Sequence, residues 1–375
     1  MMFLFGGREK SSETLGVVLD ISDSVINIGI VLSKEDQPLP EIVWSYQELI
    51  TATQTPKGRE SRLTISLLNA FMELSNTGFA ALRKREITKL PTLIQVAITA
   101  PLAYTVARTV SVTSSKPFKV TQKLFSELEK KAANEAKKSC ASQLLTKDLD
   151  LEMLSNSTVA LSVNGYPTHF PFKSTATEVK LCQMITLSSK KIVNELNKLR
   201  DKILPKAEID MDSFMSIYFR AVLEKAPNTT EACFINSTLK GTELMVLRDS
   251  LPVSSTYLAI EMPTNPRSKA VSTATKNVSL QELTTLFKNT GDGLSLPKKM
   301  YLHSTSLVES SLISLLETAS KSATGVAHQV HSTITEFFLP TGTSPDPLAC
   351  SAFVFHKKLY EDRYIEESLN MLKYT

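Results

Sequence analysis

The feature that most constrains the fold of this chain is a strand, polar turn and strand pattern that occurs once in each half. The first copy, LGVVLDISDSVINIGIVL, covers residues 15–32 and carries four polar side chains in its turn: Asp20, Ser22, Asp23 and Ser24. The second copy, EACFINSTLKGTELMVL, covers residues 231–247. Apolar runs on both sides of a polar turn predict β-hairpins. Because 375 residues are too many for one compact core, the two hairpins predict two related lobes.

The segments that follow the first hairpin predict an α/β lobe. Residues 42–46 have the composition of a third strand. Between residues 60 and 84, apolar side chains recur at helical spacing and predict a long helix. The run LIQVAITAP at 93–101 is almost continuously apolar, which is typical of a central strand that is buried on both faces.

The middle of the chain predicts a separate α+β unit at about 104–190. A strand at 104–115 precedes a helix for which Thr121 is the expected N-cap. A second strand at 157–172 contains an Asn-Gly turn at 164–166, and a third strand follows at 178–188. One helix among three strands indicates a small unit inserted into the first lobe.

Further helices are predicted from periodicity and capping signals. Apolar spacing predicts helices at 189–204, at 211–225 before Pro227, and at 361–372. Capping boxes at Ser279 with Glu282 and at Ser306 with Glu309 predict two more helix starts. The sequence KKMYLH at 298–303 predicts a short strand that leads into the second of these helices.

Composition excludes several classes of protein. The net charge of +4 comes without a basic stripe, which argues against a nucleic-acid groove. The four cysteines are widely spaced, so a zinc site or a disulfide framework is not indicated and a reduced, cytoplasmic chain is the simple interpretation. No apolar run approaches the ~20 residues of a membrane span. The start, MMFLFGG, is expected to be a packed or frayed tail, or alternatively a membrane-surface contact through Met1, Phe3, Leu4 and Phe5.

Two other patterns bear on chemistry. His328 and His331 are three residues apart on an expected helix, a spacing that can place two metal ligands on one face. No further ligand stands near them in the sequence, so a surface or half-buried pair is the preferred interpretation. A Gly-x-Ser-x-Gly nucleophile elbow is absent from the sequence, which argues against a hydrolase triad.

The order of these motifs resembles the actin-like ATPase superfamily, and within it the PilM-type pilus proteins and the FtsA-type division proteins. The two hairpins resemble the first and second phosphate loops. MYLHSTSLVESSLISLLE at 300–317 resembles the adenosine-contacting strand, turn and helix. The unit at 104–190 is similar to the subdomain inserted in PilM-type and FtsA-type chains, so the resemblance spans nearly the whole sequence.

The resemblance implies ATP with Mg²⁺ as cofactor, with Asp20 as the residue that orders the metal. The implied nucleotide-binding residues are Asp20, Ser22, Asp23, Ser24, Asn236, Thr238, Gly241, Thr242, Glu243, Ser304 and Thr305. Several of these residues depart from the family pattern, because Thr238, Ser304 and Thr305 stand where glycines are usual. Asn236 stands for an Asp and would hold a Mg²⁺ shell less well. Glycine makes up only 12 of 375 residues, about 3% against about 7% in average proteins, so we expect weak or absent ATP binding and no hydrolysis.

The resemblance also predicts the architecture. We expect an α/β, two-lobed actin-like (ribonuclease H-like) fold with a small α+β subdomain inserted in the first lobe. The expected divisions are a tail at 1–13, a first lobe at 14–103 and 191–228, the inserted SHS2-like subdomain at 104–190, a second lobe at 229–345, and a segment at 346–375 that packs back on the first lobe.

The function that the resemblance implies is a cytoplasmic PilM-like scaffold at the inner face of the plasma membrane. Its partner would be the short N-terminal cytoplasmic tail of a single-span membrane protein, bound beside the inserted unit around residues 104–112 and 159–172. A homo-oligomer is compatible with this role, whereas nucleic acid is not an expected partner. Two alternatives stay open: an FtsA-like division adaptor that polymerises at the membrane, and an active ATPase or small-molecule kinase of the same superfamily.

Overall fold

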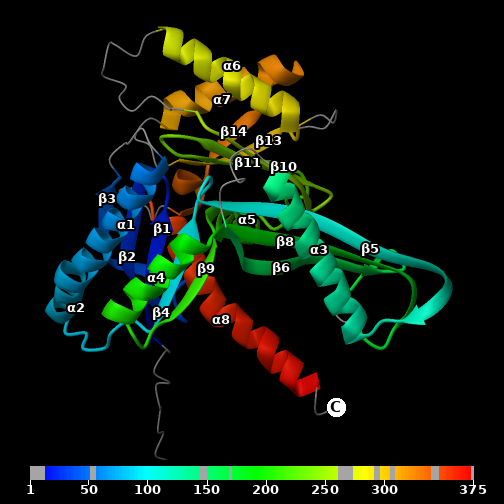
Figure 1. Ribbon diagram of the computed structural model, residues 1–375, viewed down its shortest axis with the longest axis horizontal. Helices are drawn as coiled ribbons and strands as arrows, with labels where there is room; N and C mark the ends of the chain where they lie inside the picture. Colours follow the sequence, from blue (N-terminus) through cyan, green and yellow to red (C-terminus); the bar gives the residue numbers. More distant parts are fainter. Residues whose placement is uncertain are drawn as a thin grey trace, which may run out of the picture.

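The computed structural model describes residues 13–50, 56–142, 150–168, 171–260, 273–290, 296–304, 309–338 and 346–372. In these ranges the strands form three sheets, two of five strands and one of four. Figure 1 shows the first five-stranded sheet at the left, the second near the top and the four-stranded sheet extending to the right. The predicted tail, apart from Glu13, and Thr305 of the adenosine-like turn lie outside the described residues.

The first sheet has the strand order β3-β2-β1-β4-β9. Its strands are β1 (Glu13–Ile21), β2 (Val25–Lys34), β3 (Glu41–Leu49), β4 (Leu93–Ile98) and β9 (Glu208–Ser213). The first three strands are antiparallel, and β4 and β9 continue the sheet parallel to β1. β1 is apolar almost to its end because both of its faces are covered, so Asp20 is the first charged side chain after Glu13.

Helices cover both faces of this sheet. One face packs against α1 (Pro56–Glu73), the π-helical turn η1 (Leu74–Gly78), α2 (Phe79–Lys84) and α4 (Lys190–Ile203). The other face packs against α8 (Ala349–Leu372). A Cβ atom added at Gly16 of β1 would lie only 2.1 Å from the ring of Phe355, so α8 sits directly on the backbone of the strand.

The second sheet repeats the first in strand order and direction. Its order is β12-β11-β10-β13-β14, with β10 and β11 as the hairpin and β13 and β14 parallel to β10. The strands are β10 (Ala232–Ser237), β11 (Thr242–Arg248), β12 (Leu251–Leu258), β13 (Lys299–Ser304) and β14 (Gln329–Ser332). One face packs against α6 (Thr273–Thr290) and α7 (Glu309–Thr324). The two-lobed α/β fold predicted from the paired hairpins is confirmed.

The third sheet belongs to the inserted unit and has the order β5-β8-β6-β7. Its elements are β5 (Ala103–Lys119), α3 (Gln122–Ser142), β6 (Leu151–Val163), β7 (Tyr166–Pro167) and β8 (Thr175–Ser189). Thr121 caps α3 as predicted, because its Oγ1 accepts a hydrogen bond from the backbone N–H of Leu124 at 3.2 Å. The turn between β6 and β7 uses left-handed backbone at Asn164 (φ 53°) and Gly165 (φ 81°), which suits an Asn-Gly pair.

A helix from the first lobe and residues of the second lobe share one core. α5 (Phe214–Lys225) is followed directly by β10, and eight of its twelve residues are buried. Tyr218 of α5 packs with Phe234 of β10, and both join a cluster that also contains Tyr301 and Phe353. The two lobes are therefore joined by a continuous apolar core.

Several predicted elements are corrected by the structure. Residues 211–213 belong to strand β9, which the sequence analysis missed, and α5 begins only at Phe214. His331 lies on strand β14. The prediction of a helix that aligns His328 with His331 is therefore wrong. α6 begins at Thr273, which puts Ser279 inside the helix and not at its start, and Ser306 lies outside the described residues. The last helix begins at Ala349, twelve residues before the predicted start at 361.

None of the described helices combines the length and the apolar character that crossing a membrane requires.

Candidate functional site

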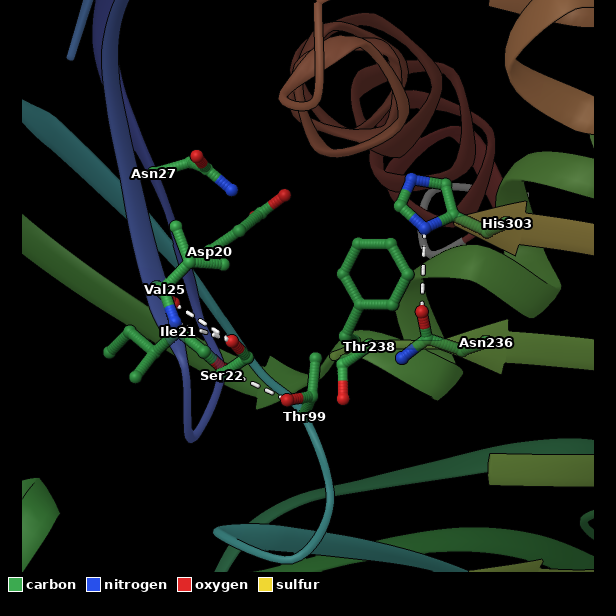
Figure 2. A pocket seen from close by; sticks show the side chains of 10 residues that line it. Asp20, Ile21, Ser22, Val25, Asn27, Thr99, Asn236, Thr238 and His303 are labelled. Atoms are coloured by element: carbon green, nitrogen blue, oxygen red, sulfur yellow. Dashed lines mark hydrogen bonds between the residues drawn. The ribbon is translucent and has the colours of Figure 1, made fainter. Parts of the chain in front are cut away.

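The turns of the two hairpins meet at one small cavity between the lobes. The cavity has a volume of about 20 Å³. Figure 2 shows Asp20, Ser22 and Asn27 on one side of it and Asn236, Thr238 and His303 on the other. The remaining lining residues are Ile21, Val25, Thr99 and Phe214. Four of the predicted site residues (Asp20, Ser22, Asn236 and Thr238) thus lie around a single cavity.

The first turn is closed by its own hydrogen bonds. The Oγ of Ser22 accepts from the backbone N–H of Val25 at 2.9 Å and donates to the carbonyl oxygen of Val25 at 2.9 Å. It also lies 3.2 Å from the Oγ of Ser24. These are the bonds of a serine turn, in which the hydroxyl stabilises the local backbone. Both serine hydroxyls are therefore used inside the turn.

Asp20 ends β1 and is tied to α8. Its Oδ1 accepts a hydrogen bond from the Oγ of Ser351 at 2.6 Å, and Gln95 donates to the carbonyl oxygen of the same serine at 2.8 Å. Burial raises the pKa of Asp20 from 3.8 to about 7, and the nearby carboxylate of Asp346 adds to this rise, while the bond from Ser351 opposes it. This carboxyl group anchors a helix, and its burial favours the protonated form.

The second turn is closed in a similar way. The backbone N–H of Thr238 donates to the carbonyl oxygen of Gly241 at 2.8 Å, and the Oγ1 of Thr238 donates to the same oxygen at 3.2 Å. The Oγ1 of Thr242 lies 3.3 Å from the Oγ of Ser237. A Cβ atom at Gly241 would lie 2.2 Å from the phenolic oxygen of Tyr257, so the glycine makes room for this ring.

Glu243 is buried at the junction of the second lobe with the first. It does not line the cavity, and a backbone hydrogen bond from Ala100 reaches its carboxyl group. Its Oε2 has no hydrogen-bond partner among the described residues. Burial raises the pKa of Glu243 from 4.5 to about 8, and the bond from Ala100 only partly opposes this rise. Glu243 is therefore neutral over most of the physiological pH range.

His303 ends β13 on the second-lobe side of the cavity. Its Nδ1 lies 3.4 Å from the Oδ1 of Asn236, and burial lowers its pKa to about 3. Ser304 follows it and is buried at the end of the strand. Asn236 is thus used to orient a neutral imidazole ring.

Phe214 and Lys240 close the site, and neither role was predicted from the sequence. The ring centroid of Phe214 lies 4.6 Å from that of His303, and Phe214 is 2% exposed. Nζ of Lys240, in the second turn, donates to the carbonyl oxygen of Asp23, in the first turn, at 3.1 Å. The N-cap at Ser213, whose Oγ accepts from the N–H of Ser216 at 3.0 Å, was the available signal that α5 begins at Phe214, beside the ends of the parallel strands.

The residues present do not fit Mg²⁺ and ATP in this geometry. A cavity of about 20 Å³ has room for about one water molecule, whereas small-molecule sites typically measure 300–1,000 Å³. Asp20, which the resemblance implied as the residue that orders the metal, is bonded to Ser351, and burial favours its neutral form. No group of three or more His, Cys, Asp or Glu side chains in the described ranges is arranged to hold a metal ion.

A third buried acidic residue, Asp212, joins the inserted unit to the first lobe. Its Oδ1 accepts from Ser155 at 2.7 Å, from Thr186 at 2.6 Å and from the backbone N–H of Ser213 at 2.8 Å. Its Oδ2 accepts from the hydroxyl of Ser216 at 2.9 Å. Because two of these bonds come from Ser155 of β6 and Thr186 of β8, Asp212 fixes the orientation of these strands on the lobe.

The residues expected beside a partner groove, 104–112 and 159–172, differ in exposure, so that only some of them are accessible. Tyr104, Val106 and Val110 are buried in the core of this unit. Its exposed large apolar side chains include Tyr166, at 77% exposure, and Phe172, at 43%. Phe172 packs edge-on against Phe125 with ring centroids 5.8 Å apart.

Comparison with known proteins shows the fold of the chain. No protein-family model and no curated protein matches the sequence. Among solved structures, a chain of a PilM-PilN type IV pilus biogenesis complex is similar over 91% of this chain and 97% of its own length, with 12% identity and a TM-score of 0.52. A Bacteroides thetaiotaomicron protein with an actin-like ATPase fold and unknown function is similar over 91% of this chain and 96% of its own, with 10% identity and a TM-score of 0.44. The cytoplasmic domain of EpsL, an inner membrane component of the type II secretion system of Vibrio cholerae, covers 93% of this chain and 95% of its own, with 8% identity and a TM-score of 0.38.

The similarity to the chain of the PilM-PilN complex agrees with the duplicated strand order of the two lobes. The chain therefore has the two-lobed actin-like fold over nearly its whole length.

Proposed function

We propose that this protein is a non-catalytic scaffold that binds the tail of a single-span membrane protein in a type IV pilus or secretion-type assembly. In this proposal it works at the cytoplasmic face of the inner membrane. The observation that carries the proposal is the filled site between the lobes. Where an actin-like enzyme needs space for a nucleotide, this chain places the ring of Phe214 and the contact from Lys240 to Asp23.

Energetics support a permanently closed site. Opening it would expose Phe214, which is almost fully buried, and would break the Lys240 contact. Exposing one large aromatic side chain costs about 1.5–3 kcal/mol. The shared core of Tyr218, Phe234, Tyr301 and Phe353 would resist any wider separation of the lobes. ATP binding would have to offset these costs, and Thr238 would stand in the second turn where a glycine is usual.

The comparison with the PilM-PilN complex suggests the kind of partner. That structure is named as a complex for type IV pilus biogenesis, and its chain shares the fold of this protein over nearly the full length. A partner of the PilN kind is therefore our proposal for this protein as well. The exposed aromatic side chains of the inserted unit, Tyr166 and Phe172, are our candidates for the contact with its tail.

One experiment tests the absence of a nucleotide function. The purified chain is heated with and without ATP and Mg²⁺, and the unfolding midpoint is recorded. A ligand at 100 times its Kd would add about 2.7 kcal/mol of stability, which is readily measured. We expect no shift at millimolar ATP. A shift of that size, or turnover of ATP by the pure protein, would refute the non-catalytic scaffold.

A second experiment tests the partner. Fluorescent peptides are made from the N-terminal tails of single-span membrane proteins encoded beside this chain, and their binding is followed by fluorescence anisotropy. We expect one tail to bind and the pair Tyr166→Ala and Phe172→Ala to weaken it. The matched control is Leu49→Ala, which removes a side chain that is 66% exposed on β3, far along the chain from the inserted unit. Equal loss in both variants, or no binding by any tail, would contradict the proposal.

A further inference from the structure

A second, larger cavity lies at the opposite end of α5 from the filled site. It is an open groove of about 500 Å³, lined by residues 225–231 and by Lys299 at the start of β13. Its ionic side chains are Lys225, Lys299 and Glu231. Nothing in the scaffold role described above uses this groove.

The two lysines of the groove are held in place by aromatic rings. Nζ of Lys225 lies 4.5 Å from the ring centroid of Phe353, and Nζ of Lys299 lies 4.9 Å from that of Tyr301. The hydroxyls of Thr229 and Tyr301 lie 3.2 Å apart and hydrogen-bond to each other. Cation–π contacts orient an ammonium group without neutralising it.

Neither lysine has a carboxylate within 4.0 Å in the described part of the chain. The neighbouring Lys357 does have one, Glu224 at 3.8 Å. Burial lowers the pKa of Lys225, and the positive charge of Lys357 lowers it further. The C-terminal end of α5 stabilises a positive charge at this position. The pKa of Lys225 is nevertheless lowered, so its protonated form is disfavoured. Two lysines without a carboxylate within 4.0 Å give the groove a positive side that an anionic group of another molecule would complement.

The chain itself carries a segment of matching charge on α8. Residues 361–367, with the sequence EDRYIEE, hold four carboxylates and one arginine. Figure 1 shows the C-terminal half of α8 extending away from both lobes. The helix is continuous from Lys357, so its rise of ~1.5 Å per residue carries this segment about 6–15 Å along the helix axis beyond that lysine. The acidic segment is therefore placed to reach another copy.

We propose that two copies of this chain associate by seating the acidic segment at 361–367 of one copy on the Lys225 and Lys299 groove of another. The contact joins two different surfaces, so it produces chains of copies unless the geometry closes. It depends on charge, so salt weakens it. It does not rest on the scaffold role, because it needs neither a membrane partner nor an empty nucleotide site.

The test is a pair of charge-reversal variants of the 375-residue chain, whose self-association is measured by sedimentation velocity. The wild type is expected to self-associate in about 0.15 M salt and to dissociate in about 1 M salt. The pair Lys225→Glu and Lys299→Glu, and separately the pair Glu366→Lys and Glu367→Lys, should each weaken association at least about tenfold. A mixture of the two variants should associate again, because the reversed segment of one then matches the reversed groove of the other.

The matched control is Lys130→Glu with Lys131→Glu, two exposed lysines on α3 that should leave association unchanged. Thermal midpoints of all variants establish that they are folded. A monomeric wild type would overturn the proposal, and if inorganic phosphate then raised its thermal midpoint, the groove would be assigned to a small anion. Association that persists in both reversed variants would overturn it too, because the contact would lie elsewhere.

Discussion

Replacing Glu243 by glutamine tests whether the lobe junction holds a neutral carboxyl group. In the folded chain this side chain is fully buried with a pKa of about 8, whereas its ordinary value is 4.5. A raised pKa means that the folded state binds the proton more tightly than the unfolded state does. The stability contributed by this proton is complete below about pH 4.5 and is lost as the pH rises towards 8.

The magnitude follows from the two pKa values. Each pH unit between them removes about 1.4 kcal/mol, so the free energy of unfolding should fall by about 4 kcal/mol between pH 5 and pH 8 on account of this group. Glutamine has nearly the same shape, and its carbonyl oxygen can still accept the bond from Ala100. It cannot ionise, so Glu243→Gln should remove this part of the pH dependence. The variant should match the wild type near pH 5 and be more stable by several kcal/mol near pH 8.

The assay is urea unfolding of both proteins at a series of pH values, with Glu127→Gln on an exposed face of α3 as the control. The control should change stability little at any pH. If Glu243→Gln instead changed stability by the same amount at pH 5 and pH 8, the carboxyl group would be ionised when folded, and the reasoning would fail.

Three further predictions concern contacts of the closed site and its surroundings. Phe214→Ala should destabilise the chain by about 3–5 kcal/mol in urea unfolding, while calorimetry with ATP should still show no binding because both turns remain closed; ATP binding by this variant would show that the ring alone blocks the site. Asp212→Ala should cost about 3 kcal/mol, because four hydrogen-bond donors lose their acceptor, and hydrogen exchange should rise in β6 and β8; unchanged exchange there would argue against its joining role. Gly241→Ala should be destabilising in the wild type and much less so with Tyr257→Ala, so a double-mutant cycle that gave simple additivity would contradict the close contact between the two.

The repeated hairpins made the fold predictable from the sequence. Strands that are buried on both faces leave nearly continuous apolar runs, so β1, β4 and β10 were evident. Edge strands were harder, because half of their side chains face solvent. β9, with the sequence EIDMDS, was therefore missed, and residues 211–213 were assigned to the helix that follows. β12 was missed for the same reason, since its side chains are mostly only partly buried.

The site was only partly predictable. The hairpin motifs pointed to Asp20, Ser22, Asn236 and Thr238, which do surround one cavity. Phe214 comes from a different element, and only the fold brings it opposite His303. The bond from Lys240 to Asp23 joins residues 217 positions apart, so local patterns could not reveal it. The sequence did indicate the loss of glycines, but not which side chains occupy the space.

The core shared by α5, β10 and α8 has a mechanical consequence. Enzymes of two-lobed design depend on a hinge that lets the lobes swing apart, whereas here aromatic rings pack in a core that both lobes share. Two lobes that cannot swing apart deform little under a pulling force, so they transmit the force from one lobe to the other. A protein that couples a membrane-anchored tail to a larger machine would benefit from such stiffness, because movement at one end then becomes movement at the other.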